Sequence, residues 1–529
     1  MSRSGNELVD RCGIGRRRFL TGLGVGTVGA LVLNNVEAHA EKVEGPVPNS
    51  APDPRFSRMF QLPAFADPRS PAVRDAMIDI GKPGGLLDAA DPLNQGPVRL
   101  ITNPELSPRN RDQDVHHMTA GTTFLGQFLD HDITFDNTSR LGVVADPAAT
   151  PNTRVPTFDL DSIYGGGPAV SPHLYEASDR AKLRVESGGL FEDLPRNRDM
   201  TAVIADPRND ENLIVAGLHA AFLLAHNRAV DAHRADHRPG DAFADSRRLI
   251  TLHWQWIVVN QFLPQVVGHS LVDDILRNGR RWYRFTKPSM PVEFQTGAYR
   301  FGHSIVRPSY RVNLHGDPGG NPATGAPAFF GFIFDPAGEH QDDPVDLRGG
   351  ARARRRFVGW QTFFDFGGDQ TQHVRPNKLI DTNISSPLFR LPLAAIPSHN
   401  GPTALPQRTL LRHLTWSMPS GQRIAASTGS PVLGSEHFPE LGKYRLGLDA
   451  STPLWYYILR EASVFHNGAQ LGPVGGRIVA EAIIGLLQLD SSSYLNTGFR
   501  PSLPRQAPGT FTITDLLRWA RVDPASRGQ

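Results

Sequence analysis

Residues that could do chemistry first gather in the segment 126–132, Gly-Gln-Phe-Leu-Asp-His-Asp. On an α-helix, Gln127, Asp130 and His131 lie three or four residues apart and share one face. Asp132 is rotated by about 100° from His131 and points elsewhere. One helical turn can therefore present an imidazole, a carboxylate and an amide to one site, and a second carboxylate to another. A solvated helix turn is the alternative reading of this segment taken alone.

Oxygen-bearing side chains alternate in a second segment, 157–165. Thr157, Asp159 and Asp161 are spaced by two residues. This pattern suits a hard cation, since Ca²⁺ takes six to eight oxygen ligands at about 2.3–2.6 Å. A turn-rich loop with an Asx cap would give the same pattern.

Two further segments supply positive charge and an imidazole. In 208–211, Arg208 and Glu211 lie three residues apart at the start of a predicted helix. Acids are also favoured there by the helix dipole alone. In 300–303, Gly302 precedes His303, which would suit a metal ligand approached closely by a large flat group. A buried structural histidine is the alternative.

The elements that must position these residues are mainly helical. Helical periodicity covers 122–135, 212–234, 246–267, 454–464 and 474–487, and strand-like alternation is scarce. The segment 312–346 is rich in Gly and Pro, which predicts a surface loop system, and the prolines of 41–70 predict an extended arm. We expect a mainly α fold with one large domain.

The first forty residues have the layout of an export signal. Arg16, Arg17 and Arg18 precede Phe-Leu and an apolar run over 21–33, and Ala-His-Ala at 38–40 suits a signal peptidase. Paired Arg before Phe-Leu resembles the twin-arginine signal, whose route carries folded, often cofactor-bound proteins to the periplasm or beyond. The run is too short for a membrane span of about 20 residues, so none is expected. A basic disordered N-terminus is the alternative.

Charge and cysteine content exclude several classes of function. The chain has 55 Lys+Arg and 53 Asp+Glu, a formal net charge of +2, which argues against a dedicated nucleic-acid binder. Its one cysteine, Cys12, lies in the predicted signal. The remainder therefore has no disulfide, iron–sulfur cluster, thiolate metal site or cysteine nucleophile.

Together and in this order, the four segments resemble the peroxidase–cyclooxygenase superfamily, the animal haem peroxidases, and their motifs resemble those of myeloperoxidase. The resemblance covers about residues 95–500 and includes 405–425 with Arg412. The segments 453–457 and 472–477 look like the bacterial branch. The N-terminal patterns thus predict a signal peptide over 1–40 and an extended arm over 41–94, and the resemblance implies a mainly helical haem peroxidase domain over 95–529.

The resemblance implies a role for each matching residue. His131 would be the distal histidine, which accepts a proton from H₂O₂ and returns it to the leaving oxygen. Gln127 would contact the distal water or a halide, and Arg208 would stabilise negative charge on the peroxide. His303 would be the proximal ligand of haem iron, and Arg412 would pair with a propionate.

Further residues match the family's calcium and ester sites. Asp132, the Thr157 carbonyl, Asp159 and Asp161 would bind Ca²⁺ and tie the distal helix to a loop. Two other carboxylates, Asp130 and Glu211, match those that form ester bonds to haem methyls in mammalian relatives. Covalently bound haem b is therefore a hypothesis.

The chain departs from the family pattern at three positions. Thr409 stands where the family usually has the Asn that orients the proximal histidine, and a hydroxyl is a weaker acceptor. Asn212 stands where myeloperoxidase has the Met of its sulfonium link, so a third covalent haem bond is not expected. Val155 lacks a hydroxyl that mammalian members supply to calcium.

The remaining question is which branch of chemistry the chain carries. Dioxygenase branches have a radical-forming Tyr three residues before the proximal histidine; here that residue is Arg300, with Tyr299 one further back. The prediction is therefore an exported peroxidase that uses H₂O₂ to oxidise small organic donors or halides through Compound I. A haem-dependent fatty-acid dioxygenase is the alternative. A non-catalytic haem-binding protein is disfavoured because both His131 and Arg208 are present. The donor and the oligomeric state are not determined by the sequence.

Overall fold

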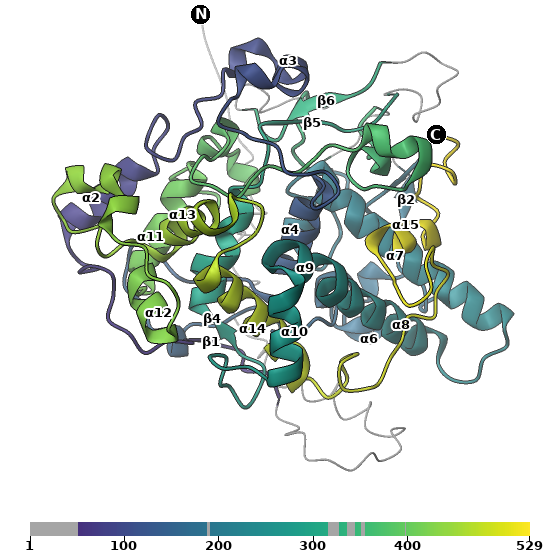
Figure 1. Cartoon of the computed structure of the whole chain (residues 1–529). Helices are drawn as coiled ribbons and strands as arrows, with labels where there is room; N and C mark the ends of the chain where they lie inside the picture. The colour runs from purple at the N-terminus through teal and green to yellow at the C-terminus, as the bar shows by residue number, and fades with distance from the viewer. Residues whose placement is uncertain (1–50, 188–190, 316–326, 336–343, 351–354, 397) are drawn as a thin grey trace, which may run out of the picture. The chain divides into compact units, whose positions relative to one another are not determined.

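Helices make up most of the secondary structure, as the periodicity predicts. A computed structural model describes residues 51–187, 191–315, 327–335, 344–350, 355–396 and 398–529 (Figure 1). The described residues fall in one compact unit, Val47–Gln529. The predicted export signal over 1–40 lies outside the described residues.

The α-helices of the described part run along most of its length. They are α2 (Pro71–Ile80), α3 (Pro97–Thr102), α4 (Gly121–Ile133), α5 (Asp161–Tyr164), α6 (Gly167–Val170), α7 (Leu213–Ala235), α8 (Ala242–Ile257), α9 (Leu263–Val267), α10 (His269–Asn278), α11 (Leu405–Thr415), α12 (Gly421–Thr428), α13 (Leu454–His466), α14 (Pro473–Leu489) and α15 (Ile513–Trp519).

The strands are short and form three two-stranded sheets. They are β1 (Phe56–Ser57), β2 (Glu186–Ser187), β3 (Glu192–Asp193), β4 (Met290–Pro291), β5 (Ser309–Arg311) and β6 (Phe330–Phe332). Strands β1 and β4 pair in parallel, with Phe56 opposite Met290, whereas β2–β3 and β5–β6 are antiparallel. The mainly α fold is confirmed.

An aromatic cluster holds the helix with the first chemical segment. Phe128 of α4 stacks on Phe222 of α7, with ring centroids 4.8 Å apart, and meets the edge of Trp254 of α8 at 5.5 Å. All three side chains are buried. Phe128 therefore faces α7 and α8, and Asp132, one turn further along α4, also contacts Trp254. In Figure 1, α4 lies near the centre of the view, and it packs on α7.

The long central helices begin and end where capping rules place them. The Asn212 side chain accepts from the amides of Ile214 and Val215 at the start of α7. The predicted helix over 246–267 begins earlier, because Asp241 caps α8 through the Ala244 amide. It also contains a π-helical turn over Val258–Phe262 before α9.

Two sequence-based expectations about the N-terminal part are wrong. The segment 41–94 was expected to be an extended arm, but it contains α2, whose Met77 and Ile80 are fully buried. Phe56 and Phe60 are also buried, so no boundary separates this segment from the rest at residue 95. The helix α2 begins directly after the proline-rich stretch 41–70, with Pro71 in its first turn, where the missing N–H costs nothing.

The Gly/Pro-rich segment 312–346 is only partly a surface loop. Its described parts include β6, which pairs with β5, and the buried side chains of Val312, Phe329 and Ile333. These residues pack on the core although the surrounding sequence lacks regular periodicity. The expectation of a surface excursion is therefore wrong for the described residues.

One helix of the described part has the length and hydropathy of a membrane span. This helix is α7, and 83% of its apolar window is buried inside the molecule. The core helix of a globular protein has the same property.

Candidate functional site

His131 lies in the last turn of α4 and is only 4% exposed. Its Nδ1 lies 2.9 Å from Oδ1 of Asn209. An amide oxygen only accepts, so Nδ1 carries the proton and Nε2 is left as an acceptor. Burial, with the positive charge of Arg208 added, lowers the pKa of His131 to about 3. The imidazole is therefore neutral near pH 7 and can act as a base.

Asn209 is itself held in orientation by a second histidine. Its Nδ2 lies 3.0 Å from Nδ1 of His219, in α7. Burial lowers the pKa of His219 to about 3, so this ring is neutral and accepts from the amide. The carbonyl oxygen of Asn209 must then face His131. Neither Asn209 nor His219 was predicted as a site residue, although Asn209 directly follows Arg208.

Arg208 is fixed beside His131 by a buried carboxylate. Its Nε and Nη2 donate to the two oxygens of Asp206 at 3.0 and 2.7 Å, and Nη2 also donates to the His131 carbonyl at 3.1 Å. The guanidinium lies 4.1 Å from the centroid of the Phe135 ring. Although burial opposes it, Arg208 lowers the pKa of Asp206. Asp206 was not predicted.

Gln127 contacts the start of α7 rather than standing alone. Its Nε2 donates to Oε2 of Glu211 at 3.0 Å, and its Oε1 accepts from Nδ2 of Asn212 at 3.0 Å. Burial raises the pKa of Glu211 to about 8, with Arg208 opposing. Arg208 and Glu211 were expected to open a helix. Instead, Arg208 lies within a 3-10 turn over Pro207–Asp210, and Glu211 follows that turn before α7 begins.

Asp130 links the distal segment to the segment that carries His303. Its Oδ2 lies 3.8 Å from Nη1 of Arg300 and 4.0 Å from Nη1 of Arg208. Its Oδ1 is buried and has no hydrogen-bond partner among the described residues. Burial raises the pKa of this carboxyl. Arg300 therefore belongs to the site, although the sequence predicted no role for it.

His303 ends a segment with unusual helical geometry. A π-helical stretch over Glu293–Ala298 runs into a 3-10 turn over Tyr299–His303. The Tyr299 hydroxyl donates to the Gly126 carbonyl of α4 at 2.9 Å, which holds the two segments together. Non-α turns of this kind are frequent at functional sites.

The predicted partner of His303 is in place. Oγ1 of Thr409 lies 3.2 Å from Nδ1 of His303. The same hydroxyl donates to the Leu405 carbonyl at 3.1 Å, so its lone pair is available to the Nδ1–H group. Nε2 of His303 is then free to act as a ligand. Burial, with Arg300 adding to it, lowers the pKa of His303.

Arg412 pairs with a carboxylate of the chain. It contacts Asp136, and its Nη1 lies 2.8 Å from Oγ of Ser139. Burial lowers the pKa of Arg412, Asp136 opposes this, and the charge of Arg300 lowers it further. Arg300 and Arg412 thus bring positive charge close to one another. The two contacts of Arg412, Asp136 and Ser139, were not predicted.

The three carboxylates among the predicted cation ligands lie close together. Asp132, Asp159 and Asp161 each offer an oxygen, and these oxygens lie within 4.8 Å of one another. Oδ1 of Asp132 is fully buried without a hydrogen-bond partner in the described part, while its Oδ2 accepts from Nε1 of Trp254 at 3.1 Å. Leu160 adopts φ of 59°, a left-handed turn between the two loop aspartates.

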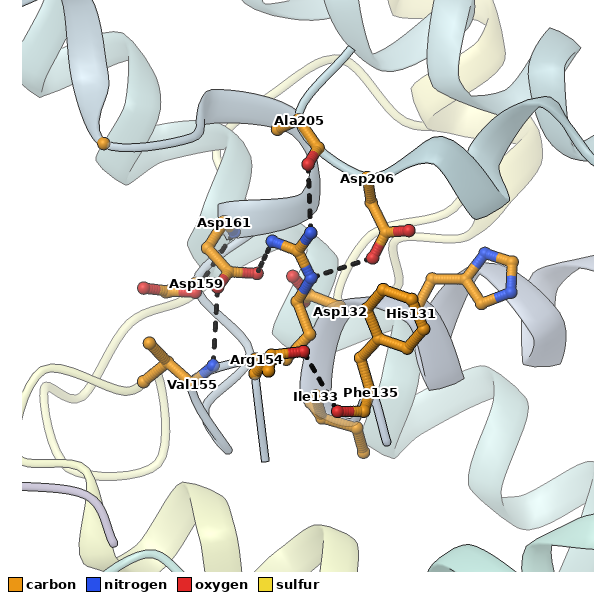
Figure 2. A network of polar contacts seen from close by, with 12 residues as sticks. His131, Asp132, Ile133, Phe135, Arg154, Val155, Asp159, Asp161, Ala205 and Asp206 are labelled. Carbon is orange, nitrogen blue, oxygen red and sulfur yellow. Dashed lines mark hydrogen bonds and ion pairs between the residues drawn. The ribbon is translucent and has the colours of Figure 1, made fainter. Parts of the chain in front are cut away.

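Contacts from other segments hold the loop that carries Asp159 and Asp161, and Figure 2 shows one of them, from Arg154. Gln255 of α8 donates to the Phe158 carbonyl at 2.9 Å. Two arginines approach the carboxylates: Arg154 lies 3.5 Å from Asp161, and Arg247 lies 3.7 Å from Asp159. Thr157 is buried in the same loop, and its carbonyl stays a predicted ligand.

Part of the chain is similar to known proteins. A sequence model described as "Animal haem peroxidase" matches residues 138–324. Thyroid peroxidase of Rattus norvegicus is 24% identical over 241 residues, 41% of this chain and 25% of the relative. Residues 138–324 therefore match the animal haem peroxidase family. The segment aligned with the rat protein spans a quarter of the length of that relative.

Solved structures share the fold of this chain. Peroxidase A from Dictyostelium discoideum has a TM-score of 0.59 at 15% identity, over 89% of this chain and 93% of that one. An Oryza sativa fatty acid alpha-dioxygenase has a TM-score of 0.52 at 14% identity, over 77% and 73% of the two chains. At these identities the likeness concerns fold alone. The bacterial branch and the individual site roles stay predictions.

Proposed function

We propose that this chain is a haem peroxidase that reduces H₂O₂ and oxidises small organic donors or halides. The proposal is carried by the presence of two groups of residues, one around His131 and one around His303. On one side a neutral His131 lies beside Arg208, and on the other His303 has Nδ1 occupied by Thr409. The contact of Asp130 with Arg300 joins the two sides.

The residues present fit a haem group. A Cβ built on Gly302, next to His303, would meet no atom within 4 Å, which leaves room for a flat group beside the ligand. Nε2 of His303 is available because Nδ1 faces Thr409. The buried Oδ1 of Asp130 lacks a partner, and such groups are costly unless something else satisfies them. Haem b, when bound, would supply the iron that exchanges electrons with peroxide and donor.

The distal residues would handle the proton of the peroxide. Nε2 of His131 would accept a proton from the oxygen nearer the iron and then return it to the leaving oxygen. Arg208, held by Asp206, would stabilise the negative charge that develops on the peroxide oxygens. Gln127 would offer its amide to a distal water or halide, with Glu211 and Asn212 fixing its orientation.

The proximal residues would hold the cofactor. His303 would ligate iron, and Thr409 would orient its ring. A haem propionate would compete with Asp136 for Arg412. Asp130 is buried, Glu211 is half-buried, and the carboxyls of both interact with Arg208, which is consistent with the ester-link hypothesis.

Calcium is proposed as the second cofactor. Three carboxylates converge, and the fully buried Oδ1 of Asp132 has no hydrogen-bond partner in the described part of the chain. Oxygen ligands and net negative charge suit Ca²⁺. Asp132 directly follows His131, so the cation would brace the end of α4 that carries the proposed base.

A fatty-acid dioxygenase is the second candidate, because structures with that title share the fold. Against it, Arg300 stands where the resemblance would require a radical-forming Tyr. The neighbouring Tyr299 is 6% exposed and its hydroxyl donates to Gly126. This buried, engaged phenol favours peroxidase over dioxygenase. Export by the twin-arginine route is proposed from the sequence of residues 1–40.

The test compares two activities of the purified holoprotein. We expect a haem absorption band, peroxide-dependent oxidation of guaiacol or bromide, and no oxygen uptake with an unsaturated fatty acid. His131→Ala should slow the reaction with H₂O₂ by about 10²–10⁴-fold while haem stays bound. His303→Ala should lose haem or change its spectrum. Oxygen uptake without peroxidase activity would favour the dioxygenase, and haem binding without either activity would favour a non-catalytic protein.

A further inference from the structure

The guanidinium of Arg154 lies between the cation cluster and the proposed distal site (Figure 2). Its Nη1 is 3.5 Å from Oδ1 of Asp161, and its Nε donates to Oδ2 of Asp206 at 2.8 Å. Its Nη2 donates to the Ala205 carbonyl at 3.0 Å. One side chain therefore contacts a carboxylate of each site.

Asp206 is shared by two arginines. The same oxygen, Oδ2, accepts from Nε of Arg154 and from Nη2 of Arg208, at 2.8 and 2.7 Å. Asp206 is fully buried, so solvent screens these interactions little. Any change in how strongly Arg154 interacts with Asp206 therefore changes the interaction left for Arg208.

A second arginine approaches the cation cluster and provides a comparison. Nη2 of Arg247 lies 3.7 Å from Oδ2 of Asp159 and 3.4 Å from the Asp159 carbonyl. Its guanidinium also lies over the Tyr164 ring at 5.1 Å. None of its contacts in the described part reaches Asp206. Arg154 and Arg247 thus bring like charge to the same cluster, but only Arg154 bridges to the distal site.

We propose that Arg154 is a positioning residue that couples the cation site to Arg208. The inference rests on the proposed function. When Asp161 binds a divalent cation, Arg154 loses Asp161 as a partner. The guanidinium of Arg154 then interacts more strongly with Asp206. Asp206 holds Arg208 less strongly as a result, and the Arg208 guanidinium gains freedom to stabilise an anion on the distal side.

The expected sign follows from the greater freedom of Arg208, and coupling between two sites is reciprocal. Calcium should tighten the binding of an anionic distal ligand, and that ligand should tighten calcium by the same factor. Couplings of this kind typically change affinity by about 5–150-fold. For a single shared carboxylate we expect the lower end, about fivefold.

The experiment measures cyanide affinity of the ferric holoprotein by absorption, with saturating calcium and after chelation. For the wild type the dissociation constant of cyanide should be about fivefold lower with calcium. Arg154→Gln should bring that ratio close to one, while calcium still binds by isothermal titration calorimetry. Arg247→Gln is the matched control and should keep the wild-type ratio.

Several outcomes would overturn the proposal. They are a wild-type ratio of one, an Arg154→Gln variant that keeps the wild-type ratio, or loss of the ratio in Arg247→Gln. If Arg154→Gln does not fold, Arg154→Lys replaces it. Lysine keeps the charge, but its single nitrogen cannot contact Asp161 and Asp206 as the fork does, so the ratio should again approach one. Absence of haem or of calcium binding in the wild type would overturn the proposed function as well, whereas binding of both without coupling removes this inference alone.

Discussion

Nδ1 of His131 lies 2.9 Å from Oδ1 of Asn209, and this contact fixes which nitrogen of the proposed base is free. The amide cannot turn over without losing its second contact, 3.0 Å from Nδ1 of His219. A neutral imidazole with a single tautomer is prepared to accept a proton at Nε2. Asn209 thus does for His131 what Thr409 does for His303: it determines the orientation and tautomer of a functional ring.

Asn209→Leu should slow the reaction with H₂O₂ by about 10–100-fold, the usual effect of removing a partner that orients a functional group. Leucine has a similar size but leaves Nδ1 of His131 without an acceptor. Stopped-flow absorption of the holoprotein measures the rate. His219→Ala should have a smaller effect in the same direction, since it only loosens the amide. An unchanged rate in Asn209→Leu would show that the contact does not matter for the base.

Thr409→Asn should lower the Fe(III)/Fe(II) potential of the bound haem. An amide oxygen is a better acceptor than the Thr409 hydroxyl, which lies 3.2 Å from Nδ1 of His303. A stronger acceptor makes the imidazole a better electron donor and favours the oxidised iron. Thr409→Val should shift the potential the other way. Spectroelectrochemical titration measures both, and two unchanged potentials would mean that Thr409 is not the orienting partner.

The ester hypothesis predicts that haem resists acid extraction with butanone. Desolvation raises the pKa values of the carboxyls of Asp130, which is buried, and Glu211, which is half-buried; that of Glu211 rises to about 8. Asp130→Ala and Glu211→Ala should each remove one attachment, and the double variant should release all of its haem. Mass spectrometry of the extracted and protein-bound fractions reads the result. Free extraction from the wild type, even after turnover with peroxide, would contradict the hypothesis.

Glu461 predicts a pH effect on stability that is separate from catalysis. It is fully buried and accepts from the amides of Val474 and Gly475 at the start of α14, and burial raises its pKa from 4.5 to about 7. Between these values the folded state keeps a proton that the unfolded state has lost. The contribution of Glu461 to the free energy of unfolding therefore falls as pH rises through this window.

Glu461→Gln should remove this pH dependence, because the amide does not titrate. The free energy of unfolding of the variant, relative to wild type, should rise between about pH 5 and about pH 8. Urea unfolding at several pH values measures it. Glu436→Gln, at a position that is 72% exposed, is the control and should show no such trend. A constant difference for Glu461→Gln would mean that the carboxyl is not kept protonated.

Local pattern was enough for much of the fold. The apolar periodicity of α4, α7, α13 and α14 predicted their existence, and their ends agree to within a few residues because caps such as Asn212 are local features. The prediction of an extended arm over 41–94 was wrong because it used local pattern alone. Its prolines are read locally as extended chain, whereas the packing of α2 on the rest of the unit is decided by contacts distant in sequence.

The charges around the site were not predictable in the same way. Asp206, Arg154 and Asn209 carry no motif of their own, and their importance comes from contacts across 52 to 78 residues of chain. Asp136, which pairs with Arg412, lies 276 residues away from it. Such partners are brought together only by the packing of helices and loops.

The sequence by itself determined which residue types are available: a helix with His131 and Asp132 on different faces, an alternating acidic loop, and a histidine beside Gly302. These follow from helical geometry and from the order of side chains along the chain. Only the tertiary structure decided their electrostatic surroundings. Because the strength of a buried charge depends on which other charges are desolvated beside it, the pairing of Arg208 with Asp206, and of Asp206 with Arg154, could be known only after folding.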